Sequence, residues 1–318
     1  MQGTFSKLNF PVILGLLFIF SSFMYAGPLH NAAKTGDLTL VLTLLADPNA
    51  NINKRSKEGH SPLHLAVIYG RIDVVIALLA DPRVNVNTRD ADGWTALHLA
   101  IVNGRVDIMQ LLLDVRDMHV NALDDQGQTI MHIAAGTGQV GIINFLLTNQ
   151  RVRVDRFDHD GWTALHYAAA ARTPEDHDPV ETIRLLLDDS RLNQLNLVTA
   201  IDRNGRTILH FAAMVGNEET VRVFLADPRI ANMINTQDSE VRSALQMATE
   251  EGHIDVVKLL LEAGALYGEN DRQEIENLLG IDPAEYLSMQ PILSYLRTRE
   301  CGLKWIGSKK KFNSDPSS

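Results

Sequence analysis

The stretch Gly93-Trp-Thr-Ala-Leu-His-Leu-Ala100 decides the fold of this chain, because near copies of it return along the sequence. Measured by their histidines, the copies at His30, His64, His98, His132 and His166 lie 34 residues apart. His210 follows after 44 residues, and Gln246 takes the same place 36 residues later. Self-similarity at such an interval indicates a stack of structural repeats.

Each copy has the pattern of two short helices joined by a turn. Thr95 supplies the hydroxyl that caps a helix N-terminus, and Gly104 allows the backbone to turn with positive φ. An apolar run such as Ile72-Asp-Val-Val-Ile-Ala-Leu-Leu79 then predicts a second helix with a buried face. Asp90-Ala-Asp-Gly93 predicts a tight turn between two short extended arms, which we call a finger. Because one such unit cannot bury its apolar face alone, stacking must supply the core.

These motifs resemble those of the ankyrin repeat family, whose T-P-L-H-x-A signature recurs here over about Pro28 to Ala265. The resemblance implies an all-α repeat solenoid: an ankyrin stack of helix-turn-helix units with β-finger turns, about seven units including atypical caps, plus C-terminal capping helices. We expect a repeat domain at 28–266 and a helical cap at 267–300, followed by a basic disordered tail at 301–318. The expected units are 28–56, 57–90, 91–124, 125–158, 159–202, 203–238 and 239–266.

The unit that contains His166 departs from the pattern in two places. It has extra residues around Arg172 to Pro179, and more around Arg191 to Thr199. Insertions in repeat stacks emerge as loops on one face, so these loops are expected either to carry specificity or to be tolerated surface insertions.

The first 26 residues read as a segment separate from the repeats. No charged residue stands between Lys7 and His30, and the apolar run Phe10–Phe20 is followed by small residues. This is the pattern of a secretory signal peptide, and it predicts cleavage after Ala26 and export to the periplasm or the medium. Two alternatives remain open, namely an uncleaved single-pass membrane anchor and a protein of the cytosol, including that of a host cell.

Composition excludes several classes of protein. Lys and Arg number 29 against 39 Asp and Glu, a formal net charge of −10, which disfavours bulk attraction to nucleic acid. The single cysteine, Cys301, rules out an intramolecular disulfide and a cysteine-rich zinc site. We therefore expect no nucleic acid partner, and a membrane contact only if the N-terminal segment is retained.

The sequence predicts no catalytic, metal or cofactor site. The histidines in register stand one repeat apart, roughly 10 Å, which is too far for one metal ion. In the ankyrin family this histidine braces the adjacent finger by hydrogen bonds, so a structural role is implied for His64, His98, His132, His166 and His210. The cluster Glu175-Asp-His-Asp178 is the one acidic group with histidine outside the repeat pattern. Cys301 is a poor candidate for a nucleophile.

The family resemblance implies a non-enzymatic scaffold that binds an unidentified protein partner on the concave face, with the chain itself a monomer. Register places the partner-binding residues in two rows. The finger row holds Arg55, Lys57, Arg89, Asp92, Trp94, Gln128, His159, Trp162, Arg203 and Arg206. The helix row holds Tyr69, Asn103, Thr137 and Met214. Trp94 and Trp162 act there either as interface anchors or as packing against the next finger. Alternative functions are a bacterial effector that acts on host proteins, a membrane-anchored adaptor and an enzyme subunit.

Overall fold

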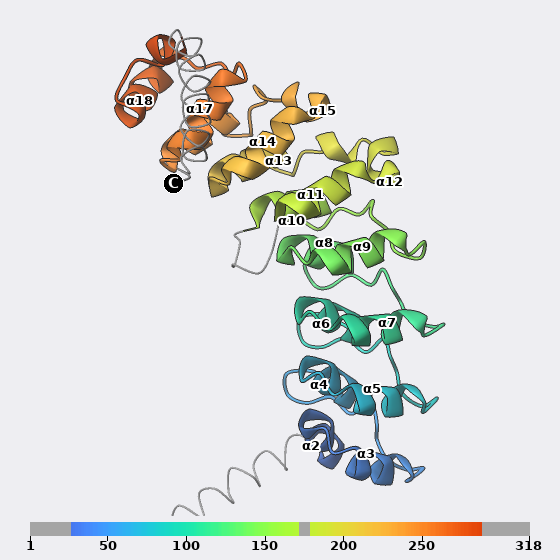
Figure 1. Cartoon of the computed structure of the whole chain (residues 1–318). Coiled ribbons are helices and arrows are strands. Elements are labelled where there is room, and N and C mark those ends of the chain that lie inside the picture. Colours follow the sequence, from blue (N-terminus) through green and yellow to red (C-terminus); the bar gives the residue numbers. More distant parts are fainter. Residues whose placement is uncertain (1–26, 172–178, 288–318) are drawn as a thin grey trace, which may run out of the picture. The chain divides into compact units, whose positions relative to one another are not determined.

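The computed structural model describes residues 27–171 and 179–287, which form helices joined by turns (Figure 1). The chain divides into two compact units, Met1–Arg203 and Asn204–Ser318, and each is described by itself. The described residues contain no strand, so the fingers are turns whose predicted extended arms do not pair as a sheet. The expectations for residues 1–26, for residues 172–178 and for the tail lie outside the described residues.

The first unit is a series of antiparallel helix pairs. Its helices are α2 (Pro28–Thr35), α3 (Leu38–Leu45), α4 (Pro62–Ile68), α5 (Ile72–Leu79), α6 (Ala96–Val102), α7 (Val106–Asp114), α8 (Ile130–Thr137), α9 (Val140–Thr148), α10 (Ala164–Ala170), α11 (Pro179–Asp188), α12 (Ser190–Gln194) and the 3₁₀ helix η1 (Leu197–Thr199). The first helices of successive pairs, α2, α4, α6, α8 and α10, pack one on the next. The chain is thus an all-helical repeat solenoid, as the period predicts.

Burial shows how the repeat pattern builds this core. Ala66, Ala100 and Ala134, one in each first helix, have no exposed surface, and their small side chains let neighbouring helices approach closely. Met109 and Ile143 stand at one equivalent position of the second helices and are also fully buried. The core is therefore continuous along the stack, because each helix pair covers the apolar face of its neighbour.

The second unit repeats the same pair and adds a cap. Its helices are α13 (Ile208–Val215), α14 (Glu218–Ala226), α15 (Pro228–Ala231), α16 (Ala244–Glu250), α17 (Ile254–Glu262) and α18 (Glu269–Leu279). Helix α13 packs on α16, and α14 packs on α17. Helix α18 covers α16 and α17, where the predicted C-terminal cap begins. Residues 283–287 are also helical.

The prediction of a loop around Arg191 to Thr199 is wrong. The segment forms α12 and η1, and its Leu192, Leu197 and Val198 are buried. These apolar side chains remove more surface from water as short helices than an exposed loop would. The second insertion is therefore part of the core, while Gln194, Leu195 and Asn196 remain exposed on its surface.

No helix in the described parts of the chain is long and apolar enough to cross a membrane. The segment that raised the possibility of an anchor precedes residue 27, outside that range.

Candidate partner-binding surface

Four of the described fingers are each held in shape by one buried carboxylate. Asp90 Oδ1 accepts hydrogen bonds from the amides of Asp92 and Trp94, at 3.0 and 2.8 Å. Asp124, Asp158 and Asp238 make the same pair of contacts in their own turns. The turn is closed by this side chain, so it keeps its form without a sheet.

Consecutive fingers of the first unit are joined tip to tip through their backbones. The amide of Asp125 donates to the carbonyl of Asp92 at 3.1 Å, and the amide of His159 donates to that of Gln126 at 2.9 Å. Ala91 and Arg203 donate to the preceding finger in the same way. Because these backbone groups are used within the stack, side chains are the main means by which the finger tips can contact another molecule.

From His64 to His210, each histidine of the first helices accepts a hydrogen bond from the N-cap amide of its own helix, and some also reach the following finger. His64 Nδ1 accepts from the Ser61 amide at 2.9 Å, which leaves Nε2 to carry the proton and donate to the Thr88 carbonyl at 3.0 Å. His132 accepts from the Thr129 amide at 3.0 Å and reaches the carbonyls of Arg156 and Trp162. His98, His166 and His210 accept from their N-cap amides in the same manner.

Burial favours the neutral form of three of these rings. It lowers the pKa of His64 to about 4 and that of His98 to about 4, and it lowers the pKa of His132 as well. A neutral imidazole with one accepting and one donating nitrogen suits the two contacts just described. In His64 and His132 both ring nitrogens are used for structure, and the register does not bring the rings of different units together.

Gln246, in the last repeat, keeps half of this arrangement. Its Oε1 accepts from the Ser243 amide at 2.7 Å, as the histidine Nδ1 does elsewhere. Its Nε2 donates to Asp271 Oδ1 of α18 at 2.8 Å. The outer partner is therefore a carboxylate of the cap, whereas His64, His132 and His210 reach backbone carbonyls.

The finger row places most of its charged side chains in solvent. Arg55, Lys57, Arg89, Asp92, His159 and Arg203 are exposed, whereas Gln128 and Arg206 are half-buried. Arg89 pairs with Asp125 of the following finger at 2.7 Å. Arg206 lies over the ring of Phe211, 4.9 Å from its centroid.

The two tryptophans of the row are half-buried and packed. The indole nitrogen of Trp94 donates to Asp124 Oδ2 of the next finger at 3.1 Å. The ring of Trp162 meets Tyr167 edge to face, with centroids 5.2 Å apart. Of the two roles considered, packing is the one these contacts describe, although part of each ring still faces solvent.

The helix row is less uniform. Tyr69 is 41% exposed, and Asn103 is exposed while its amide donates to the Leu99 carbonyl. Thr137 and Met214 are half-buried, and the Thr137 hydroxyl is occupied by the Ile133 carbonyl of its own helix. In each repeat the finger leads directly into the first helix, and this connection is what brings the two rows near each other.

Sequence reasoning missed a second bracing system on the links between repeats. Asn121 Nδ2 donates to the Arg151 carbonyl at 2.7 Å, and its Oδ1 accepts from the Arg153 amide at 2.8 Å. Asn53 and Asn87 join their own links in the same way. The signal was present as an asparagine every 34 residues in this part of the chain.

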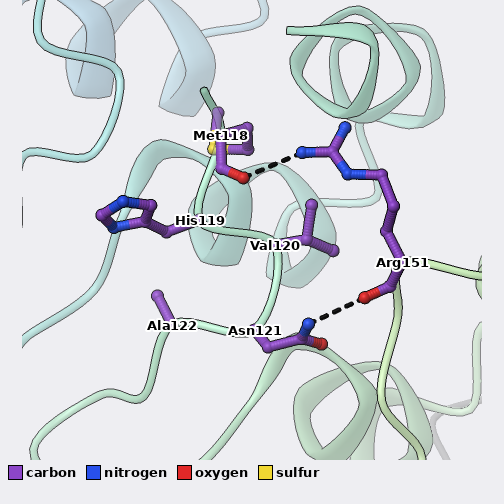
Figure 2. Close-up of a pocket in the computed structure, with 6 residues that line it drawn as sticks. All are labelled: Met118, His119, Val120, Asn121, Ala122 and Arg151. Carbon is purple, nitrogen blue, oxygen red and sulfur yellow. Dashed lines mark hydrogen bonds between the residues drawn. The ribbon is translucent and has the colours of Figure 1, made fainter. Parts of the chain in front are cut away.

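The link that follows α7 borders an open hollow of about 440 Å³. It is lined by Met118, His119, Val120, Asn121, Ala122 and Arg151 (Figure 2). The Arg151 guanidinium donates to the Met118 carbonyl at 2.9 Å and to the Leu113 carbonyl at 2.8 Å. Because its amide and guanidinium groups are engaged in holding the links, the hollow does not have the convergent polar groups of a reaction site.

Within residues 27–171 and 179–287, no three His, Cys, Asp or Glu side chains are placed to hold a metal ion. The cluster Glu175-Asp-His-Asp178 and Cys301 lie outside the described residues.

Comparison with known proteins supports the repeat assignment. A family model for ankyrin repeats matches three times, over residues 29–124, 115–196 and 170–271. The chain is also 31% identical over 67 residues to the nuclear factor NF-kappa-B p105 subunit of Gallus gallus. That match covers 21% of this chain and 7% of the length of that protein.

Proposed function

Because this chain belongs to the ankyrin repeat family, we propose that it is a non-enzymatic scaffold that binds a protein partner through the finger and helix rows. The partner binds without nucleic acid, and the scaffold acts as a monomer. The function rests on side-chain contacts, with no catalytic residue or cofactor.

One observation carries this proposal. In the first unit the finger backbones are joined to one another, while the side chains of Arg55, Arg89, Asp92 and Arg203 stand exposed on the same row. A fixed frame with outward side chains loses little conformational entropy when a partner binds, because it is already ordered. The ordered frame thus presents polar side chains to solvent, as a binding scaffold requires.

Proximity labelling in the native host tests this proposal. The double variant Arg89→Ala, Arg203→Ala is compared with the wild-type chain and with a control, Ile76→Ala. Ile76 is 49% exposed on a second helix, away from both rows. We expect a set of labelled proteins that the double variant loses and the control retains. Equal labelling by all three chains would contradict the proposal.

We propose that the mature protein is exported. The support is the apolar run Phe10–Phe20, and the start of the first repeat helix at Pro28, directly after the expected cut. The intact mass and compartment of the protein in its host test this. A species that begins near Gly27 outside the cytosol supports export. A full-length membrane-bound species indicates an anchored adaptor, and a soluble cytosolic one favours an effector or another intracellular role.

A further inference from the structure

The residue directly before each finger turn forms a column along the first unit. In chain order the column reads Arg55, Arg89, Leu123, Phe157 and Ile201. Leu123 is 40% exposed, Phe157 is 48% exposed and Ile201 is 50% exposed. Three large apolar side chains in succession therefore face solvent on the fingers, and we call these three residues the apolar column.

The turn does not require apolar residues at this position. Arg55 Nε donates to the Gly59 carbonyl of its own finger at 3.0 Å, and Arg89 Nε donates to the Gly93 carbonyl at the same distance. Leu, Phe and Ile cannot make this bond. The last three fingers of the unit thus give up a polar brace and expose apolar surface, which in soluble proteins marks an interaction site when it is contiguous.

We propose that the apolar column is the specificity element of the binding surface, and that it receives an amphipathic helix of the partner. This inference rests on the proposed scaffold function and adds the chemistry of the ligand. Adjacent fingers are one repeat apart, roughly 10 Å for packed helices. Two turns of an α-helix rise about 10.8 Å, so apolar residues seven apart on one helix face match three fingers in succession.

Charge sets the direction of the bound helix. The first finger exposes Lys54, Arg55 and Lys57 with Glu58 as its exposed carboxylate, so it is net positive although the chain as a whole carries −10. The Arg89 charge of the second finger is offset by Asp125. The end of the helix that passes the first finger therefore carries Asp or Glu, and the half toward its other end carries the apolar residues.

A displayed library of helix-favouring 30-residue peptides, long enough to span the five fingers, is selected against the full chain to test this. Selected peptides are then measured by fluorescence anisotropy against Phe157→Arg and Leu123→Gln. Both variants are expected to fold, because the chain itself uses Arg at positions 55 and 89 of this column and Gln at position 237 of the second unit. The control is Ile76→Arg, at an equally exposed apolar residue on a second helix.

The expected result is a consensus with apolar residues seven apart and acidic residues at one end. Each column variant weakens its binding at least tenfold with an unchanged melting temperature, and the control leaves it unaltered. Peptides that lose affinity in Trp94→Ala or Arg203→Ala, but bind Phe157→Arg as well as wild type, overturn the inference and leave the scaffold function standing. A consensus with apolar residues two or three apart also overturns it. Absence of any peptide sensitive to these surface variants contradicts the scaffold function itself.

Discussion

Replacing Val241 by glycine is expected to stabilise the second unit. Val241 takes the place of the glycine in the last finger, and its φ is +63°. Gly205, in the preceding finger, has φ +75°. A left-handed residue that is not glycine costs roughly 1–2 kcal/mol, and a β-branched one is strained further because its side chain crowds the backbone.

The net gain follows from two opposing terms. Glycine loses more conformational freedom on folding than other residues, and this lowers the free energy of unfolding by about 0.5–1 kcal/mol. The valine side chain is 62% exposed, so its removal gives up little buried apolar surface. We therefore expect Val241→Gly to raise the free energy of unfolding by about 1 kcal/mol, and the melting temperature by roughly 2–8 °C depending on how many residues unfold together.

Urea denaturation followed by circular dichroism measures this change, with Gly205→Val as the mirror experiment. A Cβ at Gly205 would meet its nearest atoms at only 3.5 Å or more, so this substitution adds backbone strain without a steric clash. It is expected to lower the free energy of unfolding by about 1 kcal/mol or more. A Val241→Gly variant that is neutral or less stable, with Gly205→Val destabilised as expected, would refute the claim that Val241 is strained.

Three further predictions concern the first unit. Gly127→Val should lower the free energy of unfolding by about 2–4 kcal/mol, because φ is +81° and a Cβ would lie 2.7 Å from the His159 ring; an unchanged melting temperature would show that the register of this finger is wrong. Stability should fall as the pH drops from 6.5 toward 4, because the unfolded chain protonates histidines such as His98 whose folded pKa is about 4. Urea titrations at several pH values give the slope of the free energy of unfolding against pH. His98→Gln should reduce this slope by up to about 1.4 kcal/mol per pH unit, and an unaltered slope would contradict the role given to His98. Asn121→Ala should cost about 1–3 kcal/mol in urea denaturation, because it removes two hydrogen bonds between links, and a loss no larger than for the exposed Gln126→Ala would contradict the bracing role.

The fold could be predicted because the residues that bind main-chain groups recur at fixed positions in the repeat. The turn carboxylate Asp90 and the ring of His98 each satisfy a main-chain group, and each recurs at the same step along the first repeats. The segment around Arg191 to Thr199 escaped prediction for the converse reason. This segment occurs once, so there is no repeat pattern from which the burial of Leu192 and Leu197 could be predicted.

The binding surface was harder to predict, because exposure is a property of neighbours. The position of Trp94 after a glycine suggested an anchor, but its indole nitrogen is bound to Asp124 of the next finger. Phe157 precedes a turn residue, and nothing in the repeat pattern indicates that it is 48% exposed. Only the structure of the packed fingers distinguishes the bonded Trp94 from the exposed Phe157.

A repeat protein supplies its own internal comparison, since equivalent positions in successive units share one backbone. At such a position, the residue that best serves the fold is the one that satisfies the backbone in the other units. Phe157 lacks the brace that Arg55 and Arg89 provide, and Val241 lacks the freedom of the glycines. Both residues leave apolar surface exposed. Neither makes up for the hydrogen bond or the backbone freedom that the equivalent residues of other units provide. If Val241→Gly is more stable, stability cannot explain why valine stands there, and binding of a partner is the better explanation for this position of the second unit.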